Sequence, residues 1–252
     1  MLPKIVFFDI EGTLTGPGGR GHSRRLGEQF DRLMDRDVIV GLLTGRDASY
    51  AKGVNRLFDL NGPIIAENGC ALIPDLKSDE TGEINFGGID SDLKEQIRDT
   101  LGQSGILSGM YEDPQKRYMF TLYLNSFPNH DPKEIISMYH QIDSLLTRIL
   151  GLEVSYSSAA VDINPTGVNK GSAVDRYCRE QGYDLSSIAF VGDSLNDRTA
   201  FEIIGEAEGQ LALVGDSAEL RKLLQGFSNV YHSKQQASEG TVEFIDVLLR
   251  SC

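Results

Sequence analysis

Two acidic residues open the part of the sequence that is best suited to chemistry. Asp9 and Glu11 stand two positions apart, after the apolar run Ile5-Val6-Phe7-Phe8 and directly before Gly12. Residues two apart in an extended strand share one face, so both carboxylates point the same way. Two such acids can hold a cation, or divide the roles of nucleophile and proton donor. Asp and Gly are also common turn residues, so a plain strand exit is the alternative interpretation.

Three later segments carry polar residues at similar positions. One apolar run ends in Thr44-Gly45-Arg46, another ends in Gly192-Asp193-Ser194-Leu195-Asn196-Asp197, and Lys170 stands at the start of an expected helix. A lysine there opposes the helix macrodipole, but beside free amides it would hold a phosphate. The alternatives are a helix N-cap for Thr44 and an exposed surface role for Lys170. Carboxylates, a hydroxyl and an ammonium together suit a hard cation and a phosphoryl group.

An alternation of strands and helices must position these residues. Continuous apolar runs at 5–8, 38–43, 64–66, 188–191 and 211–214 are typical of strands covered on both faces. Leu26, Phe30 and Leu33 have the spacing of a helix between the first two runs. We therefore predict an α/β fold with a Rossmann-like, doubly wound parallel sheet. Open sheets of this kind bind ligands at the carboxyl ends of their strands.

The pattern changes between residues 76 and 165. Polar residues at 77–82 indicate a linker or hairpin, and the residues that follow predict two amphipathic helices and several short strands. We place a core domain at residues 1–75 plus 166–252 and an inserted α+β domain at residues 76–165. The Gly-rich stretch 16–21 lacks the ending of a phosphate-binding P-loop, so we interpret it as a mobile connecting loop or flap.

Composition limits the class of partner. The chain has 252 residues and a formal net charge of -13, which argues against nucleic acid but allows a small anion beside a metal ion. Cys70, Cys178 and Cys252 indicate neither a disulfide framework nor a zinc site, and the four histidines lack ligand spacing. We find no signal peptide and no apolar run long enough to span a bilayer. We expect a cytoplasmic protein without a membrane partner, either a monomer or a homodimer.

In their order and spacing, these residues resemble the four motifs of the haloacid dehalogenase (HAD) superfamily of phosphotransferases. Asp9-Ile10-Glu11-Gly12-Thr13-Leu14 resembles the first motif, Thr44-Gly45 the second, Lys170 the third and the stretch 192–197 the fourth. The inserted domain is similar to the α+β cap of Cof-like sugar phosphatases, sucrose phosphatases and phosphomannomutases. Residues 60–69 look most like archaeal-type phosphoglycolate phosphatases. The resemblance covers essentially the whole chain.

The resemblance implies a Mg²⁺-dependent phosphomonoester hydrolase that forms an aspartyl-phosphate. Its substrate would be a small phosphorylated metabolite, such as a sugar phosphate or a phosphoglycolate-like compound. Asp9 is the expected nucleophile and Glu11 the expected proton donor and acceptor, with Thr44 and Lys170 on the phosphoryl oxygens. The expected magnesium site contains Asp9, the backbone carbonyl of Glu11, Asp193, Asn196 and Asp197. A cap would close over the site and contact the rest of the substrate.

The predicted substrate contacts extend to the rim of the site. They are Thr44, Gly45, Arg46, Asn68 and Lys170. As alternatives, Asn68 shapes a turn and Arg46 is solvated. Most phosphatases of the superfamily carry Asp where this chain has Glu11, although enolase-phosphatases also read Asp-x-Glu-Gly-Thr. The extra methylene moves the proton donor about 1–1.5 Å outward. We expect activity to survive this difference.

Three other functions are alternatives. A phosphomutase of the phosphomannomutase type would use the same Asp9 and a similar cap. A non-catalytic HAD-like binding protein would be expected to have lost some of the acids, Thr44 or Lys170, and all are present. A Rossmann dehydrogenase would carry a Gly-x-Gly-x-x-Gly fingerprint after its first strand, which is absent here.

Overall fold

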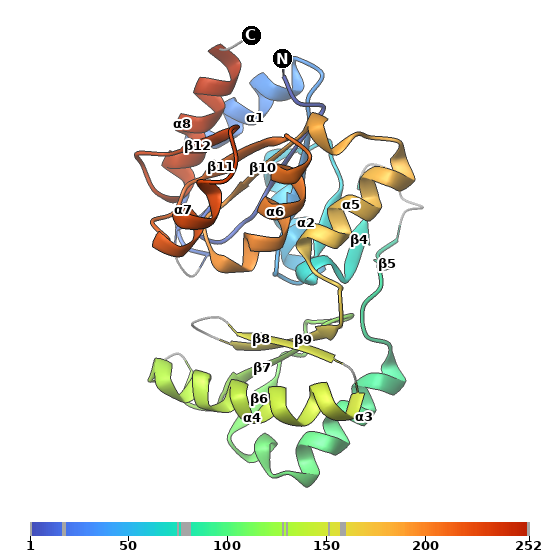
Figure 1. The fold of residues 1–252 in the computed structure, drawn as a ribbon. Helices are drawn as coiled ribbons and strands as arrows, with labels where there is room; N and C mark the ends of the chain where they lie inside the picture. The colour runs from blue at the N-terminus through green and yellow to red at the C-terminus, as the bar shows by residue number, and fades with distance from the viewer. Residues whose placement is uncertain are drawn as a thin grey trace. The chain divides into compact units, whose positions relative to one another are not determined.

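The chain folds into two compact units. The computed structural model describes residues 2–16, 19–74, 76, 82–127, 129, 131–150, 152–156 and 160–250. The first unit contains residues 1–84 and 169–252, and the second contains residues 85–168 (Figure 1). Most of the expected linker at 77–82, part of the loop at 16–21, His130 and Cys252 lie outside the described residues.

The first unit is built on an eight-stranded sheet in the order β12-β11-β10-β1-β2-β3-β4-β5. Neighbouring strands from β12 to β3 run parallel, whereas β4 pairs antiparallel with β3. The strands are β1 (Ile5–Phe8), β2 (Ile39–Leu43), β3 (Ile64–Ala66), β4 (Ala71–Ile73), β5 (Ile84–Asn85), β10 (Ile188–Gly192), β11 (Gln210–Leu213) and β12 (Val230–His232). β1 lies between β10 and β2, so it is central in the sheet.

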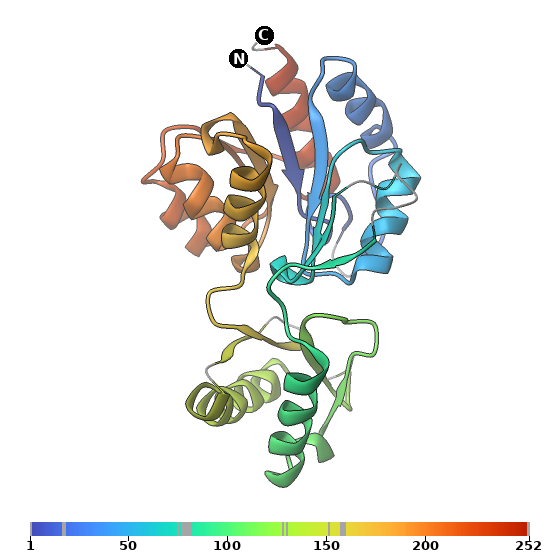
Figure 2. The ribbon, with the colours of Figure 1, turned by 90° about the vertical axis from the view of Figure 1, so that its right-hand side faces the viewer.

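Helices cover both faces of this sheet. They are α1 (Leu26–Met34), α2 (Ala48–Phe58), α5 (Lys170–Gln181), α6 (Arg198–Glu206), α7 (Ala218–Leu224) and α8 (Ala237–Arg250). Figure 2 shows α1 and α2 on one side of the strands and α5 and α6 on the other. Phe7 meets Tyr177 of α5 edge-on, and the next residue, Phe8, meets Phe30 of α1. The four residues of β1 are fully buried, which explains their continuous apolar run.

The second unit is an α+β domain. Its antiparallel sheet has the order β6-β7-β9-β8. Its elements are α3 (Ser91–Gln103), β6 (Met110–Glu112), β7 (Phe120–Leu124), α4 (Pro132–Leu150), β8 (Leu152–Tyr156) and β9 (Ala160–Pro165), with a short 3-10 helix, η3 (Ile106–Ser108). One apolar core joins both helices to the sheet, through residues such as Leu101, Leu122, Ile142 and Val161. The predicted fold class, a doubly wound parallel sheet with an α+β insertion, is confirmed.

Two further features bear on the expectations from composition. Cys70 and Cys178 are buried free thiols. None of the helices within the described residues is both long enough and apolar enough to cross a membrane.

Candidate active site

The sheet brings the first and fourth motifs together at one edge. Asp9 follows β1 directly, and its backbone N–H donates to the Val191 carbonyl of β10 at 3.0 Å. Asp193 follows β10, and Thr44 follows β2 on the other side of β1. Because these strands are parallel, their carboxyl ends lie at the same edge.

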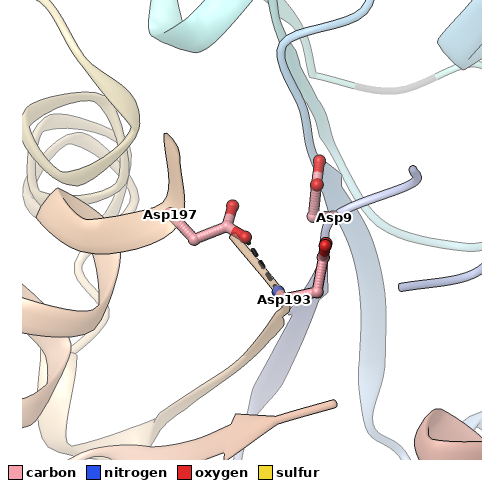
Figure 3. Close-up of side chains that lie close together, drawn as sticks. All are labelled: Asp9, Asp193 and Asp197. Carbon is pink, nitrogen blue, oxygen red and sulfur yellow. Dashed lines mark hydrogen bonds between the residues drawn. The ribbon is translucent and has the colours of Figure 1, made fainter. Parts of the chain in front are cut away.

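Three aspartates form an acidic cluster at this edge. Carboxylate oxygens of Asp9, Asp193 and Asp197 lie within 4.8 Å of one another, as Figure 3 shows. Asp9 and Asp197 are buried and Asp193 is half-buried. Like-charged groups this close in a buried site need a compensating positive charge.

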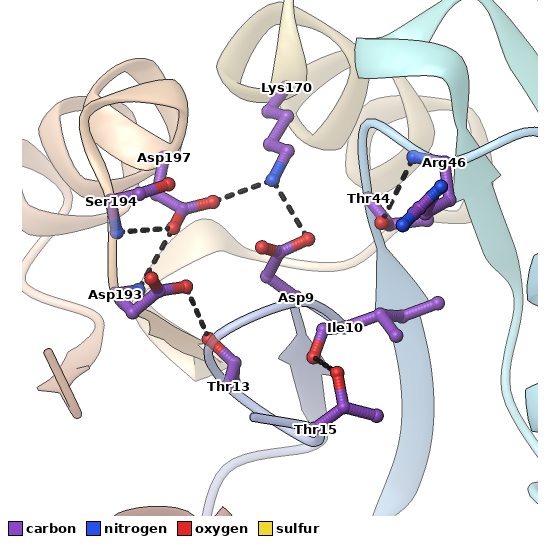
Figure 4. A network of polar contacts seen from close by, with 10 residues as sticks. All are labelled: Asp9, Ile10, Thr13, Thr15, Thr44, Arg46, Lys170, Asp193, Ser194 and Asp197. Atoms are coloured by element: carbon purple, nitrogen blue, oxygen red, sulfur yellow. Dashed lines mark hydrogen bonds and ion pairs between the residues drawn. The ribbon is translucent and has the colours of Figure 1, made fainter. Parts of the chain in front are cut away.

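Lys170 supplies one positive charge. It is the first residue of α5, and its side chain is only 2% exposed. Its ammonium lies 2.6 Å from an Asp197 oxygen and 3.0 Å from an Asp9 oxygen, so it bridges the two acids (Figure 4). Asn169 caps the helix through Ser172. The Asn169 side chain thereby accepts one of the free backbone N–H groups at the start of α5, while the Lys170 ammonium donates to the acids.

Asp197 differs from the other two acids in its contacts. One oxygen takes the Lys170 ammonium, and the other accepts the backbone N–H groups of Asp193 at 2.9 Å and Ser194 at 3.1 Å. Asp197 thus holds both the lysine and the turn after β10. Asp193 is oriented by Thr13, whose hydroxyl donates to it at 3.0 Å. Asn196 is exposed on the short helix η5 (Leu195–Asp197).

The pKa values reflect this crowding. Burial raises the pKa of Asp9 to about 6, although Lys170 opposes the shift. Burial, with Asp197 and Asp9 nearby, raises the pKa of Asp193 to about 8. For Lys170, burial alone would lower the pKa, but Asp197 and Asp9 outweigh it and the pKa is raised.

A divalent cation fits this donor set. Three carboxylates and one ammonium leave two negative charges when all are ionised. Oxygen ligands of this kind are those that Mg²⁺ prefers. The side-chain carboxylate of Glu11 does not belong to this cluster among the described residues, so only its backbone carbonyl stays a predicted ligand.

Glu11 instead pairs with Arg46. The carboxylate accepts from the Arg46 guanidinium, which lies over the Tyr50 ring with 5.1 Å to the ring centroid. Tyr50 belongs to α2, whose N-cap is Asp47, so the alternative role of Thr44 as the cap of this helix is wrong. Neither Tyr50 nor its contact with Arg46 was expected, because the contact depends on where α2 packs.

Thr44, Gly45 and Asn68 lie together beside β1. Thr44 is 1% exposed, and its hydroxyl accepts from the Arg46 backbone N–H at 3.2 Å. The Asn68 N–H donates to the Thr44 carbonyl at 3.1 Å, from a left-handed backbone with φ of 52°. A Cβ atom at Gly45 would lie 2.8 Å from the Asn68 side-chain oxygen. Asn68 therefore shapes the turn after β3 and also places its side chain next to Thr44-Gly45.

Two residues of the first motif had no assigned role in the sequence. Thr13 orients Asp193, as described above. Gly12 has a φ of +74°, and a Cβ there would overlap the Asp193 carboxylate. Both stand inside the stretch Asp9–Leu14, so their place in the motif was the available signal. Their specific contacts depend on the pairing of β1 with β10.

The acidic cluster and its lysine lie at the edge of a doubly wound sheet in a chain with an α+β insertion, as the resemblance to the HAD superfamily implies. Among solved structures, a Thermoplasma acidophilum protein is similar with a TM-score of 0.76 and 16% identity, covering 98% of this chain and 99% of that one. Sucrose-phosphatase from Synechocystis sp. PCC6803, solved with sucrose and phosphate, is similar with a TM-score of 0.66 and 18% identity, covering 98% of both chains. At these identities the likeness shows a shared fold.

Sequence comparison identifies the family. The model of sucrose-6F-phosphate phosphohydrolase matches residues 2–247, and the chain belongs to this family. A phosphoglycolate phosphatase of Methanosarcina mazei is 25% identical over 254 residues, covering 97% of this chain and 96% of the relative. The resemblance to HAD phosphatases found in the sequence is confirmed, and the chain is an enzyme of the phosphatase class.

Proposed function

We propose that the protein is a Mg²⁺-dependent phosphomonoester hydrolase that acts on a small phosphorylated metabolite through an aspartyl-phosphate at Asp9. The observation that carries the proposal is the buried Asp9–Lys170–Asp197 bridge next to Asp193. It holds a carboxylate nucleophile beside a cation, as phosphoryl transfer requires.

The first step transfers the phosphoryl group to the enzyme. An oxygen of Asp9 attacks phosphorus in line, and the bond between phosphorus and the leaving oxygen breaks. Glu11 donates a proton to that oxygen, so the leaving group departs as an alcohol. Lys170 and the Thr44 hydroxyl hold phosphoryl oxygens and offset their developing charge.

The second step releases phosphate and restores Asp9. Glu11, now a carboxylate, takes a proton from a water molecule that attacks phosphorus. The bond between phosphorus and Asp9 breaks, and inorganic phosphate leaves. Asp197 holds Lys170 throughout, at 2.6 Å from its ammonium, and so keeps the cation in place.

Asp9, Asp193 and the Glu11 backbone carbonyl would hold Mg²⁺. When bound, the ion would neutralise negative charge on the phosphoryl oxygens and on the acids. Asn196 remains a proposed outer ligand from its motif position. For Asp197, its contacts with Lys170 and two backbone amides favour a supporting role over direct metal binding.

The substrate class rests on relatives. The matching family is described as acting on sucrose-6F-phosphate, and the Methanosarcina relative is named a phosphoglycolate phosphatase. We propose a sugar phosphate or a phosphoglycolate-like ester as substrate, with Arg46 and Asn68 at the rim of the site. We propose the cap role for residues 85–168, which form a unit of their own.

A substrate panel tests this proposal. Phosphate release would be measured from phosphoglycolate, hexose phosphates, sucrose-6F-phosphate, mannosyl-3-phosphoglycerate and p-nitrophenyl phosphate, with Mg²⁺ and with EDTA. We expect turnover with Mg²⁺, none with EDTA, and one metabolite far ahead of the others. Release without a bisphosphate activator would also exclude the mutase alternative. No release from any ester would contradict the proposal.

A further inference from the structure

Arg46 links the first motif to the second. Its guanidinium pairs with the Glu11 carboxylate and lies over the Tyr50 ring, 5.1 Å from the centroid. Its backbone N–H donates to the Thr44 hydroxyl at 3.2 Å. The arginine is therefore held by Thr44, just after β2, and by Tyr50 of α2. Its guanidinium reaches Glu11, three residues past the end of β1.

The loop after β1 packs against Tyr50 and Glu11. Gly19 has a φ of +72°, and a Cβ there would lie 3.0 Å from the Tyr50 hydroxyl and 3.2 Å from a Glu11 oxygen. A glycine suits both the left-handed backbone and the close approach. The sequence indicates only a connecting loop or flap in this stretch, but residue 19 belongs to the surroundings of Glu11.

The ion pair is too exposed to matter much for stability. The side chains of Arg46 and Glu11 are 34% and 36% exposed. Water screens ion pairs at this exposure, and their contribution to folding is small. What an arginine fork does provide is a fixed orientation of the carboxylate. Proton transfer depends on that orientation, because the donor must lie within hydrogen-bond reach of the leaving oxygen.

We propose that Arg46 is a positioning residue for Glu11, and that Tyr50 and Gly19 support it. This inference rests on the proposed role of Glu11 as proton donor and acceptor. A glutamate has one more rotatable bond than an aspartate, so its carboxylate can occupy more positions. The Arg46 contact removes that freedom. Arg46 thus acts on the reaction through Glu11, in place of the direct substrate contact expected from sequence.

The test compares two leaving groups. The departure of p-nitrophenolate needs little help from a proton donor, whereas a metabolite alcohol needs a proton. The kcat/KM values, which report steps up to release of the leaving group, would be measured for p-nitrophenyl phosphate and for the best metabolite of the panel. The variants are Arg46→Gln, Arg46→Lys, Glu11→Gln and the double variant Arg46→Gln/Glu11→Gln. Arg56→Gln, at an exposed arginine on α2, is the matched control.

We expect Arg46→Gln to lower kcat/KM for the metabolite at least tenfold and for p-nitrophenyl phosphate less than threefold. Glu11→Gln should show the same preference with a larger loss, about 100-fold or more, as removal of a general acid does. In the Glu11→Gln background, Arg46→Gln should have no further effect. Arg46→Lys should recover part of the loss, and Arg56→Gln should match the wild type.

Two results would overturn the inference. Equal losses on both substrates, persisting in the Glu11→Gln background, would make Arg46 a direct substrate contact. Unchanged metabolite turnover in Arg46→Gln would remove any role for the pair. A purely structural role would lower the melting temperature and affect both substrates alike. Failure of the proposed function itself is a separate result, because the wild type would then hydrolyse neither ester.

Discussion

Lys170 sets the charge balance of the site at the scale of single residues. It is buried, and it contacts both the proposed nucleophile Asp9 and the supporting Asp197. Burial raises the pKa values of Asp9 and Asp193, the neighbouring acids add to the shift, and the single Lys170 ammonium does not offset it. A divalent cation would remove the imbalance, so metal binding and proton release should be coupled.

This coupling predicts a pH dependence. The pKa of Asp193 is about 8 and that of Asp9 about 6, both above the range of an unfolded aspartate. Near pH 7, Asp193 is mostly protonated and Asp9 mostly ionised, so binding one Mg²⁺ should release about one proton. Apparent affinity should rise as pH increases from 6 to 8 and then level off. Titration calorimetry in two buffers of different ionisation enthalpy measures the released protons.

The stability of the metal-free protein should depend on pH through the same two groups, Asp9 and Asp193. Because both folded-state pKa values are raised, their stabilising contribution is complete below about pH 4. It is lost as pH rises through about 6 for Asp9 and about 8 for Asp193. Urea unfolding in EDTA measures this trend, with Asp193→Asn as the comparison. In the calorimetric experiment, Mg²⁺ binding that releases no proton at pH 7 would show that Asp193 is already ionised, and would contradict the predicted coupling.

At the scale of elements, the site depends on how closely the turn after β1 approaches the turn after β10. Gly12 has a φ of +74°, and a Cβ there would overlap the Asp193 carboxylate. Gly182, the C-cap of α5, also has a φ of +74°, but a Cβ there would meet no atom within 4 Å. A comparison of alanine variants at the two glycines therefore separates the effect of backbone strain from that of displacing Asp193.

We predict different outcomes for the two alanine variants. Gly182→Ala should lose about 1 kcal/mol of stability through backbone strain alone and keep its activity. Gly12→Ala carries the same strain and should also lose Mg²⁺ affinity and at least 100-fold in kcat, because Asp193 must move. Thermal unfolding and phosphate release measure both effects. Equal activity in the two variants would contradict the role given to Gly12.

The elements also show what could be predicted from the sequence. The buried run of β1 and the acid that follows it located Asp9, because a strand covered on both faces needs continuous apolar residues. The antiparallel strand β4 was not predicted from the sequence. The sequence predicts the last helix at Thr241–Leu249, whereas α8 begins four residues earlier, at Ala237. Helix ends depend on local capping more than on periodicity.

The sequence predicted the positions of the site residues better than the directions of their side chains. The order of Asp9, Thr44, Lys170 and Asp193 along the chain placed them at strand ends or a helix start. Nothing local in the sequence indicates that the Glu11 carboxylate turns toward Arg46. Nor does it indicate that the Asp197 oxygens accept hydrogen bonds from Lys170 and two backbone amides. These contacts arise from the packing of α2, α5 and the turns, which join residues far apart in the chain.

At the scale of the whole molecule, the chain has a common architecture and a strong negative charge. The match to the family model covers residues 2–247 and so includes residues of both units. The net charge is -13, yet the proposed substrate is an anion. The local cations at the site, Lys170 and the expected Mg²⁺, must therefore set the sign that the substrate meets.

The central claim is that Asp9 carries the phosphoryl group. The most direct measurement is to quench the enzyme during turnover, reduce the acyl-phosphate with borohydride and locate the product by mass spectrometry of peptides. We predict homoserine at position 9, only with substrate and Mg²⁺ present. Asp9→Asn should form no homoserine at position 9, and its kcat should fall by several orders of magnitude. Asp31→Asn, at an exposed aspartate of α1, should still form homoserine at position 9 and keep the wild-type kcat. Sustained turnover by Asp9→Asn, or homoserine at another aspartate, would contradict the account.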